Sequence, residues 1–294
     1  MNATEIGKNW ALPNYVNELF RADVSQTPLL SMIGGLTGGR QTTSSEFPTA
    51  VLFDYPQSND REASKAEEEQ EGNVVQRYGE MIDLSYMRVS DEEDENSVED
   101  EIAFQMHHRL VNIARNVEHS FINGRYYKDE YGVAGNRTRG LIELTENGTT
   151  IDAHGGMLTK RMLDCLYKKM EEAGAYFDNM VMFLPAFQKQ VLTDIYAKEF
   201  NATWGAREHI GGVACTQIET GKFKMGVVCD RFIPKDTILL VDVAHLTPVF
   251  QTIPEKGVIY EEKTSSDTIE IDTRIGLAHA PAFLHGSITN LSFT

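Results

Sequence analysis

One stretch of the sequence, from Asn96 to Gly124, has the pattern of a long amphipathic helix. Large apolar residues recur in it every three or four positions and no proline interrupts them. These residues are Val98, Ile102, Met106, Leu110, Ile113, Val117 and Phe121. Ser97 can cap the start, the acidic residues after it favour the positive end of the helix dipole, and Gly124 is suited to end the helix. We therefore predict a single helix on the order of 40 Å long, whose apolar face must be covered by other elements.

The composition fits a globular protein with a strongly acidic surface. The 294 residues are 41% hydrophobic, which is enough for one large core or two smaller ones. Acidic residues outnumber basic ones by 44 to 27, a formal charge of −17, so capture of nucleic acid through its phosphates is not expected. A negatively charged inner surface is compatible with a container for DNA, because it does not bind the polymer while the DNA moves along it. No signal peptide or membrane span is predicted.

The sequence has no pattern typical of a catalytic site. It lacks Gly-x-Ser-x-Gly, a Walker loop, His-Glu-x-x-His and Cys-x-x-Cys. His107 and His108 are neighbours on the predicted helix, about 100° apart, and so cannot share a metal ion. His279 and His285 lie in or beside the last predicted strands, where we expect structural roles. We therefore predict no enzyme activity, no catalytic residue and no cofactor.

Two groups of residues could suggest a metal site, and both have a simpler explanation. The acidic string at 91–95 lacks the glycine turn and ligand offsets of a calcium loop, and it lies where acids stabilise the start of the long helix. Cys165, Cys215 and Cys229 are an odd number without metal-type spacing, each in an apolar context. This pattern indicates reduced thiols in the core. We predict no bound metal.

Residues 1–40 have the features of an arm rather than a compact domain. The helical turns predicted at 13–20 and 28–33 are short, and they end in Gly34-Gly35 and Gly38-Gly39. The apolar side chains of the arm include Trp10, Leu29, Leu30 and Ile33. They have few local partners, so we expect them to lie at a subunit interface. The alternative is an arm that folds back on its own domain.

Residues 41–90 predict an extended hairpin. Two β-prone runs, 42–55 and 74–89, flank a polar middle at 57–72. Such a hairpin has little core of its own. The polar middle mixes charges of both signs, and its residues include Arg61, Lys65, Glu67 and Glu68. This tip is either a solvated loop or, as we expect for these four residues, part of a subunit interface.

Residues 137–250 indicate an α+β domain. Its predicted elements are a helix at 158–173, a buried strand at 180–184, a helix that begins after Pro185, a hairpin at 213–229 and a strand at 238–243. The order helix, strand, helix occupies about forty residues, and the glycine at 221 suits the turn of the hairpin. The region is long enough to form a core of its own.

The last residues, 251–294, return to β-structure. Runs at 257–263 and 268–278 flank a polar turn. In the second run a period-two pattern sets Ile269, Ile271, Thr273 and Ile275 against Glu270, Asp272 and Arg274. No helix follows in the sequence to cover these strands. We expect the long helix to cover them, which makes its domain discontinuous, formed by 91–136 together with 251–294.

Taken in order, an arm, a long hairpin, a spine helix with late strands and an inserted α+β domain resemble the major capsid proteins of tailed double-stranded DNA bacteriophages, which have the Hong Kong 97-type fold. The resemblance covers nearly the whole chain. Local patterns that support it are Asn123-Gly124-Arg125, then Arg137-Thr138-Arg139-Gly140-Leu141-Ile142, and Arg274-Ile275-Gly276-Leu277-Ala278-His279-Ala280-Pro281-Ala282.

The resemblance implies a shell protein that forms hexamers and pentamers in an icosahedral capsid around the phage genome. The arm and the extended loop, 41–90, would lap over neighbouring subunits, with Arg137 and Arg139 also at the interface. The peripheral domain would be 91–136 plus 251–294, and the axial domain 137–250. The structural spine would comprise Ile102, Met106, Leu110, Val117 and Phe121. Implied partners are portal, scaffolding and decoration proteins, with assembly in the host cytoplasm and a final place in the virion.

Two alternatives stay open. The shell protein of an encapsulin nanocompartment would have a similar fold, but it would hold a protein cargo and no DNA. A metal- or nucleotide-dependent enzyme is the alternative from another class of protein. Titration of the purified protein with Mg²⁺ and nucleotides would detect it.

Overall fold

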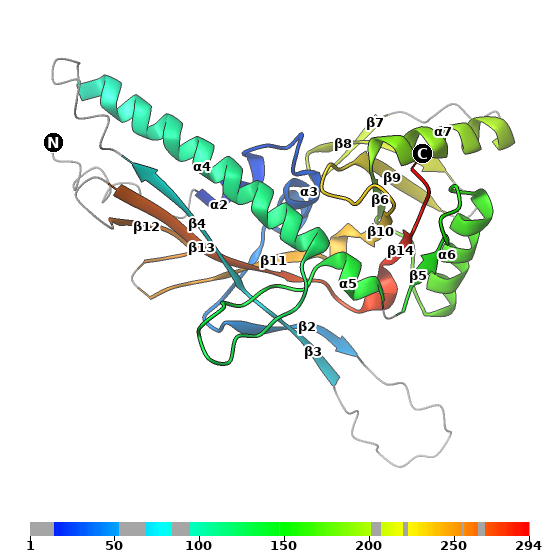
Figure 1. Ribbon diagram of the computed structural model, residues 1–294, viewed down its shortest axis with the longest axis horizontal. Coiled ribbons are helices and arrows are strands. Elements are labelled where there is room, and N and C mark those ends of the chain that lie inside the picture. Colours follow the sequence, from blue (N-terminus) through cyan, green and yellow to red (C-terminus); the bar gives the residue numbers. More distant parts are fainter. Residues whose placement is uncertain are drawn as a thin grey trace, which may run out of the picture.

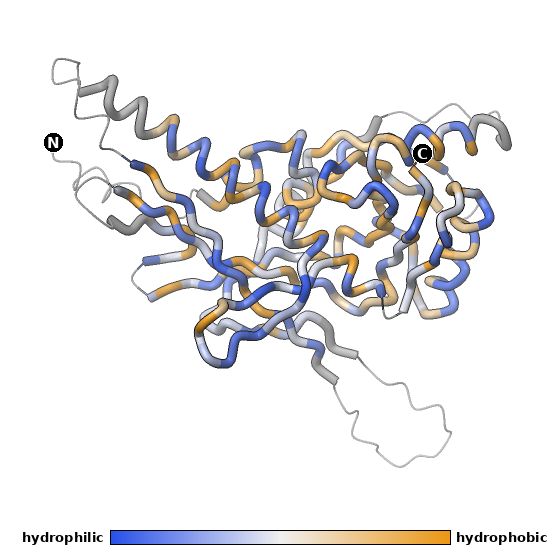
Figure 2. Tube along the Cα trace, viewed as in Figure 1, coloured by the Kyte–Doolittle hydropathy of each residue, from blue (hydrophilic) through white to orange (hydrophobic). Residues whose placement is uncertain are grey.

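The computed structural model of the chain describes residues 15–52, 69–83, 95–146, 148–200, 207–219, 223–254, 256–263 and 268–293. A long helix runs along one side, a five-stranded and a seven-stranded sheet lie toward opposite ends, and a two-stranded sheet projects from the body (Figure 1). Hydrophobic residues gather between these layers, above all in the strands of the seven-stranded sheet (Figure 2). Among the described helices, none is both long enough and apolar enough to cross a membrane.

The predicted spine helix is confirmed as α4 (Glu95–Asn123), within one residue of the expected bounds. Four of the predicted spine residues are buried in one hydrophobic core: Met106, Leu110, Val117 and Phe121. The side chain of Ile102 lies outside the described residues. The chain crosses close behind the end of the helix, where a Cβ atom on Gly124 would lie 2.4 Å from the carbonyl oxygen of Thr138. Glycine is required there because it allows this close approach.

The apolar face of α4 covers the five-stranded sheet (Figure 1). In spatial order its strands are β1 (Arg40–Thr42), β11 (Thr247–Gln251), β13 (Thr268–Ala278) and β12 (Ile259–Lys263), and β4 (Gln76–Asp83) also pairs with β13. Leu110 and Ile113 of the helix share a core with Ile82 and Ile271 of the strands. The prediction that the spine helix packs against the late strands is confirmed.

The predicted hairpin is present, but its second strand differs from the prediction. The two-stranded sheet pairs β2 (Glu46–Leu52) with β3 (Glu69–Val74) in antiparallel register. The described part of the run 74–89 instead forms β4, which pairs with β13 from Thr268 to Ile275. Tyr78 and Ile82 of β4 are buried. Only a strand under α4 can remove both side chains from water, because a free hairpin offers no such cover.

The seven-stranded sheet has the order β5 (Thr150–Asp152), β14 (Gly286–Thr289), β10 (Ile238–Asp242), β6 (Met180–Leu184), β9 (Lys224–Cys229), β8 (Val213–Glu219) and β7 (Arg207–Ile210). Every residue of β6 and β10 is buried. This burial agrees with the continuous apolar run that predicted the strand at 180–184. The antiparallel pairing of β8 with β9 confirms the predicted hairpin at 213–229.

Helices α6 (Lys160–Glu172) and α7 (Ala186–Phe200) confirm the predicted helices on either side of β6. The first helix begins at an N-cap, where the Thr159 hydroxyl accepts a 3.3 Å hydrogen bond from the Met162 N–H. Leu163, Leu166 and Met170 then pack in a second core with the seven-stranded sheet. Shorter elements are α5 (Leu141–Glu146) and the 3₁₀ turns η2 (Val243–His245) and η3 (Ala282–Leu284).

The last strand, β14, lies between β5 and β10 in the seven-stranded sheet. The expectation that all of 251–294 returns to the spine sheet is therefore wrong for this strand. Ile288 is fully buried in the second core, and a Cβ atom on Gly286 would lie 2.6 Å from the sulfur of Met170. The backbone groups of the buried strand β10 need partners on both edges, and β14 supplies them on one.

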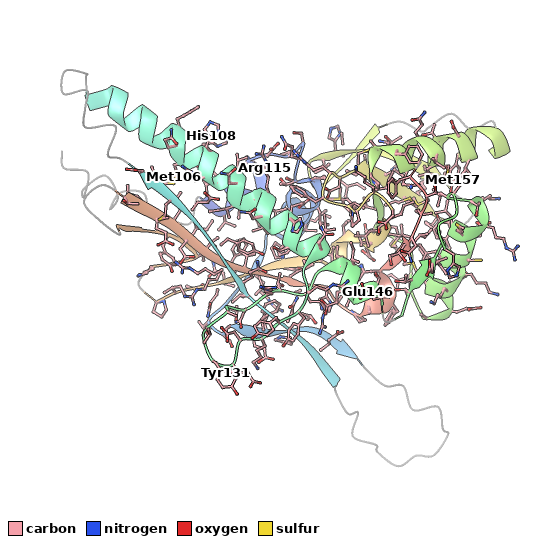
Figure 3. The ribbon with its side chains drawn as sticks, in the orientation of Figure 1. Met106, His108, Arg115, Tyr131, Glu146 and Met157 are labelled. Atoms are coloured by element: carbon pink, nitrogen blue, oxygen red, sulfur yellow. The ribbon has the colours of Figure 1, made fainter. Side chains whose placement is uncertain are left out.

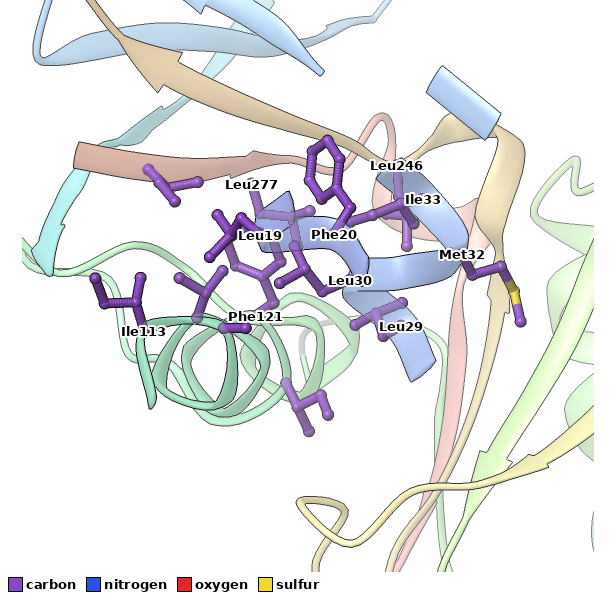
Figure 4. Packing of buried hydrophobic residues seen from close by; sticks show 14 of the residues in the cluster. Leu19, Phe20, Leu29, Leu30, Met32, Ile33, Ile113, Phe121, Leu246 and Leu277 are labelled. Carbon is purple, nitrogen blue, oxygen red and sulfur yellow. The ribbon is translucent and has the colours of Figure 1, made fainter. Parts of the chain in front are cut away.

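The described part of the arm folds back on its own chain. Helices α2 (Tyr15–Arg21) and α3 (Pro28–Thr37) pack against α4, and Leu29, Leu30 and Ile33 are at most 1% exposed (Figure 4). The predicted subunit-interface role of these three residues is wrong. Their apolar surface is covered by the first core, so none is left for a neighbour. Trp10 lies outside the described residues.

Of the two glycine pairs predicted to end this segment, Gly34-Gly35 lies inside α3, whereas Gly38-Gly39 follows its last residue. A Cβ atom on Gly34 would lie 2.3 Å from the ring of Phe20, and one on Gly35 would lie 2.3 Å from the carbonyl oxygen of Gly211. The helix ends later, at Gly38, whose φ of 68° is left-handed. Gly34 and Gly35 therefore allow close packing, and Gly38 provides the termination.

Candidate functional site, a braced hairpin and an anchored arm

Arg139 ties the base of the hairpin to the body of the subunit. Its guanidinium forms an ion pair with Glu71 of β3 and lies 3.7 Å from the carboxylate of Glu143 on α5. The same group lies over the ring of Tyr126, 4.9 Å from its centre. The resemblance to phage capsid proteins implied that Arg139 lies at the subunit interface. Its charge is instead used within the subunit, because two carboxylates surround a side chain that is only 19% exposed.

Asn73 also fixes the hairpin base through hydrogen bonds, and it was not predicted from the sequence. Its fully buried amide donates a 2.9 Å hydrogen bond to the Leu277 carbonyl and a longer one to the Arg139 carbonyl. Its side-chain oxygen accepts from the N–H groups of Arg139 and Val74, each at 2.8 Å. One side chain therefore joins the hairpin, β13 and the segment after the spine. No local sequence pattern distinguishes this asparagine from a turn residue.

The other predicted interface residues are not brought together in the described structure. Arg61, Lys65, Glu67 and Glu68 lie outside the described residues. Arg137 is exposed and forms no ion pair within the described part of the chain. The two-stranded part of the hairpin extends away from both larger sheets (Figure 1). Its fixed base and projecting strands are suited to contact outside the subunit.

Glu118 anchors the arm to the spine helix. This fully buried residue of α4 accepts hydrogen bonds from the Leu29 N–H at 2.8 Å and the Leu30 N–H at 2.7 Å. Both N–H groups belong to the first turn of α3, where the side chain of Thr27 provides no cap. A carboxylate at this end satisfies unpaired donors and opposes the positive end of the helix dipole. The only sequence signal for Glu118 is an acid directly after the apolar position Val117.

Asp230, in the connection after β9, forms a buried carboxyl pair with Glu118. One oxygen of Asp230 accepts a 2.8 Å hydrogen bond from the Phe232 N–H, and the other is buried without a donor. Burial, and then the neighbouring Asp230 carboxyl, raise the pKa of Glu118 well above its ordinary value. Burial also raises the pKa of Asp230. A proton held between the two carboxyls would supply the missing donor.

The charged groups around this pair come from three elements. Arg231 follows Asp230 and donates a 2.5 Å hydrogen bond to Gln26 of the arm. On α4, Arg115 forms a 2.8 Å ion pair with Asp23 of the arm, and the ring of His119 packs against that of Phe232. The cations on this side are therefore bound to the arm or exposed, and the carboxyl pair has no buried cationic partner among the described residues.

A model of the SU10 major capsid protein family matches residues 2–292 of the sequence. The chain belongs to the SU10 major capsid protein family. No curated protein sequence matches it.

The solved structures similar to this capsid protein include capsid and encapsulin shells. The capsid protein of cyanophage A-1(L) has a TM-score of 0.58 at 10% identity, with 91% of this chain and 93% of that chain covered. The holo-SrpI encapsulin complex of Synechococcus elongatus has a TM-score of 0.57 at 10% identity, with 87% and 86% covered. Mycobacterium phage Patience has a TM-score of 0.54 at 11% identity, with 95% and 89% covered. At these identities the likenesses show the fold alone.

The expected Hong Kong 97-type fold and the expected role as a phage major capsid protein are confirmed. The family is a structural one and places the protein in the virion capsid. Similarity of fold does not separate phage capsids from encapsulins, because both occur among the similar structures. The family match makes the distinction, and it favours the phage capsid over the encapsulin alternative.

His279 and His285 of the capsid protein are buried, as expected for residues with a structural role. The pKa of His285 is lowered to about 4 by burial, so its ring is neutral at pH 7. Its Nδ1 accepts from the Asp242 N–H at 3.3 Å, which leaves Nε2 to donate to the His279 carbonyl at 2.6 Å. Burial also lowers the pKa of His279 to about 4. His107 and His108 are exposed on α4.

The cysteines only partly match the prediction of core thiols. Cys215 is buried, whereas Cys165 and Cys229 are exposed. The apolar sequence context was misleading because Cys165 lies on the solvent side of the amphipathic helix α6, and Cys229 is the exposed last residue of β9. Within the described residues no group of three or more potential ligands could hold a metal ion.

Proposed function

We propose that this capsid protein assembles as hexamers and pentamers into an icosahedral shell that encloses the double-stranded DNA genome of a tailed phage. The observation that carries the proposal is the hairpin, whose base is fixed by Asn73 and Arg139 while its strands extend beyond the body (Figure 1). A two-stranded hairpin is marginally stable by itself in water. The surface of a neighbouring subunit would complete its packing, and the fixed base would direct it there.

The charge of the chain supports enclosure of DNA rather than tight binding to it. A formal charge of −17 repels the phosphate backbone, so packaged DNA would slide along the wall instead of adhering to it. We propose that the subunit contributes no catalytic step to packaging. Portal, scaffolding and decoration proteins are the proposed partners, and assembly is proposed to occur in the host cytoplasm.

Assembly is tested by expression of the protein alone and together with candidate scaffolding and portal proteins. Size-exclusion chromatography with light scattering and negative-stain imaging should reveal closed shells. Complexes that also contain the packaging motor should protect DNA from nuclease. A monodisperse monomer under every condition would contradict the proposal. Shells that hold a protein cargo and never protect DNA would favour the encapsulin alternative.

The hairpin itself is tested by replacing residues 57–68 with a two-residue turn. The subunit should keep its melting temperature, because the deletion retains Asn73 and Glu71, the two hairpin residues through which the base is braced to the body. Shell yield or shell melting temperature should fall. A control variant with the same twelve residues in scrambled order preserves the reach of the hairpin and separates length from specific pairing. If the shortened variant gave the same shell yield and shell melting temperature as the native protein, the proposed contact of the hairpin with a neighbouring subunit would be contradicted.

A further inference from the structure

The chain between α4 and α5 forms a stiff loop, the exit loop, residues 125–137. Its ends are joined by two backbone hydrogen bonds between Tyr127 and Arg137, at 3.1 and 2.8 Å. Inside it, the Asp129 carboxylate accepts from the N–H groups of Tyr131 at 3.1 Å, Ala134 at 2.8 Å and Gly135 at 2.7 Å. These bonds, above all that from Gly135, lower the pKa of Asp129, which therefore stays charged at neutral pH. The conformation of the tip is thus fixed before any partner binds.

The side chain of Asn136 adds to this stiffness, because its oxygen accepts a 2.9 Å hydrogen bond from the Asp129 N–H. Gly132 and Gly135 have φ values of 71° and 74°, with open space where a Cβ atom would be. Glycine is needed at both positions for the left-handed backbone and not for close packing. The hydrogen bonds and the two glycines thus fix one backbone conformation of the exit loop at the surface.

The fixed tip presents two apolar side chains to solvent. Tyr131 is 87% exposed and Val133 is 88% exposed, against 59% for Met81, the next most exposed large apolar residue among those described. Tyr131 lies at the outer edge of the molecule, away from both large sheets (Figure 3). Residues 131–135 carry no charge. The subunit itself gains nothing from two uncovered apolar groups on a rigid turn, because it leaves them in water.

We propose that the exit-loop tip binds a second copy of this capsid protein in the shell, with Tyr131 and Val133 as the anchoring side chains. The proposal rests on the proposed function. A tyrosine on a preorganised turn is suited to an interface anchor, because little conformational entropy remains to be lost on binding. The shell provides a second copy at high local concentration.

Charge favours a second copy over DNA as the occupant. Each copy carries a formal charge of −17, so contacts between copies are best made by uncharged or cationic surface. The tip is uncharged and Arg137 beside it is an exposed cation without an ion pair in the described part of the chain. The other two cations of the exit loop are paired, since Lys128 lies 2.5 Å from the Glu46 carboxylate and Arg125 lies 2.5 Å from that of Glu146. One available cation is too few for stable binding to a phosphate backbone.

A photo-crosslinker identifies what the tip touches. The substitution Tyr131→p-benzoylphenylalanine places the reactive group at the tip, and shells are irradiated beside dissociated subunits. The expected result is a crosslinked band near twice the 33.0 kDa of the subunit, in shells and not in dissociated subunits. Shells that form normally and yield no such band, or yield crosslinks to DNA alone, would overturn the proposal.

Substitutions test the energetic role of the tip. The double variant Tyr131→Ser with Val133→Ser should give at least tenfold fewer shells at equal protein concentration, with an unchanged melting temperature of the free subunit. The control, Tyr131→Phe with Val133→Ile, keeps the apolar surface and should assemble like the native protein. Equal assembly of all three would refute the tip as an anchor while the proposed function stands. If the native protein formed no shell, the proposed function would be refuted. The proposed contact of the exit-loop tip, which depends on that function, would be refuted as well.

Discussion

Replacement of Asp230 by asparagine tests the buried carboxyl pair that anchors the arm. In the native protein, Glu118 holds the first turn of α3, and Asp230 faces it from the connection after β9. The substituted amide would keep an oxygen for the Phe232 N–H and would add an N–H donor for Glu118. We expect Asp230→Asn to stabilise the folded subunit increasingly as pH rises, because the native pair loses its shared proton toward high pH.

The size of the effect follows from proton linkage. Both carboxyls have a raised pKa in the folded state, against reference values of 4.5 for Glu118 and 3.8 for Asp230. The folded state therefore binds more protons than the unfolded state above these values, so the stability from the shared proton is present at low pH and is lost as pH rises. One proton gives a slope of at most about 1.4 kcal/mol per pH unit. A hydrogen bond to a charged group contributes about 1.5–3 kcal/mol.

The assay is thermal unfolding of the dissociated subunit between pH 5 and pH 8. At about 2–4 °C per kcal/mol, Asp230→Asn should raise the melting temperature by up to roughly 3–12 °C once the native pair has lost its shared proton. The rise should therefore be larger at pH 8 than at pH 5. Glu118→Gln should lower it at neutral pH, because glutamine has one acceptor oxygen for two N–H groups and an unpaired donor costs about 1–3 kcal/mol. Asp178→Asn, the same change at an exposed position, is the control for overall charge.

The two variants of the pair should therefore shift stability in opposite directions while both reduce its dependence on pH. A lower melting temperature for Asp230→Asn at pH 8 would refute the shared proton as the source of stability. So would a pH profile parallel to that of the native protein. Either result would mean that Asp230 and Glu118 do not share a stabilising proton.

Leu110→Asp should prevent folding, because it places an unpaired charge in the core under α4 at a cost of several kcal/mol; circular dichroism and solubility check this. Gly35→Ala should destabilise the subunit by about 1–3 kcal/mol, since the new Cβ atom would lie 2.3 Å from the carbonyl oxygen of Gly211; a chemical denaturation curve equal to that of the native protein would contradict it. Mature particles should show a single band near 33.0 kDa on a denaturing gel, because the acidic neighbours of Lys65 favour its charged, non-nucleophilic form; a ladder that disappears in Lys65→Ala would show covalent crosslinks.

The sequence could predict elements whose signal lies within a few residues of each position. The spine helix has an apolar repeat of three to four residues, and its observed bounds differ from the prediction by one residue at each end. Strand β6 is a continuous apolar run, and the sequence of β13 has a period-two pattern from Ile269 to Ile275. The order of these elements also sufficed to indicate the fold, because it runs through nearly the whole chain.

The candidate site was less predictable, because its contacts join residues far apart in the sequence. Glu118 accepts hydrogen bonds from arm residues that lie 88 and 89 positions away in the sequence. Asn73 donates one to Leu277, which lies 204 positions away. A buried acid that caps another helix has the same local pattern as a solvated acid beside an apolar stripe. The predicted interface residues Leu29, Leu30 and Ile33 show the reverse problem, since an apolar arm is the same sequence whether it binds a neighbour or its own core.

The sequence by itself thus determined the spine helix, the helices and strands of the inserted domain, the acidic charge and the family, all of which depend on local periodicity, composition or the order of elements. Only the tertiary structure decided which strand completes the hairpin, that β14 joins the seven-stranded sheet, and that the arm is held by Glu118. The physical reason is that periodicity shows which face of an element must be buried and not which other surface buries it. That choice depends on shape, on unpaired backbone groups and on buried charge at places distant in the chain.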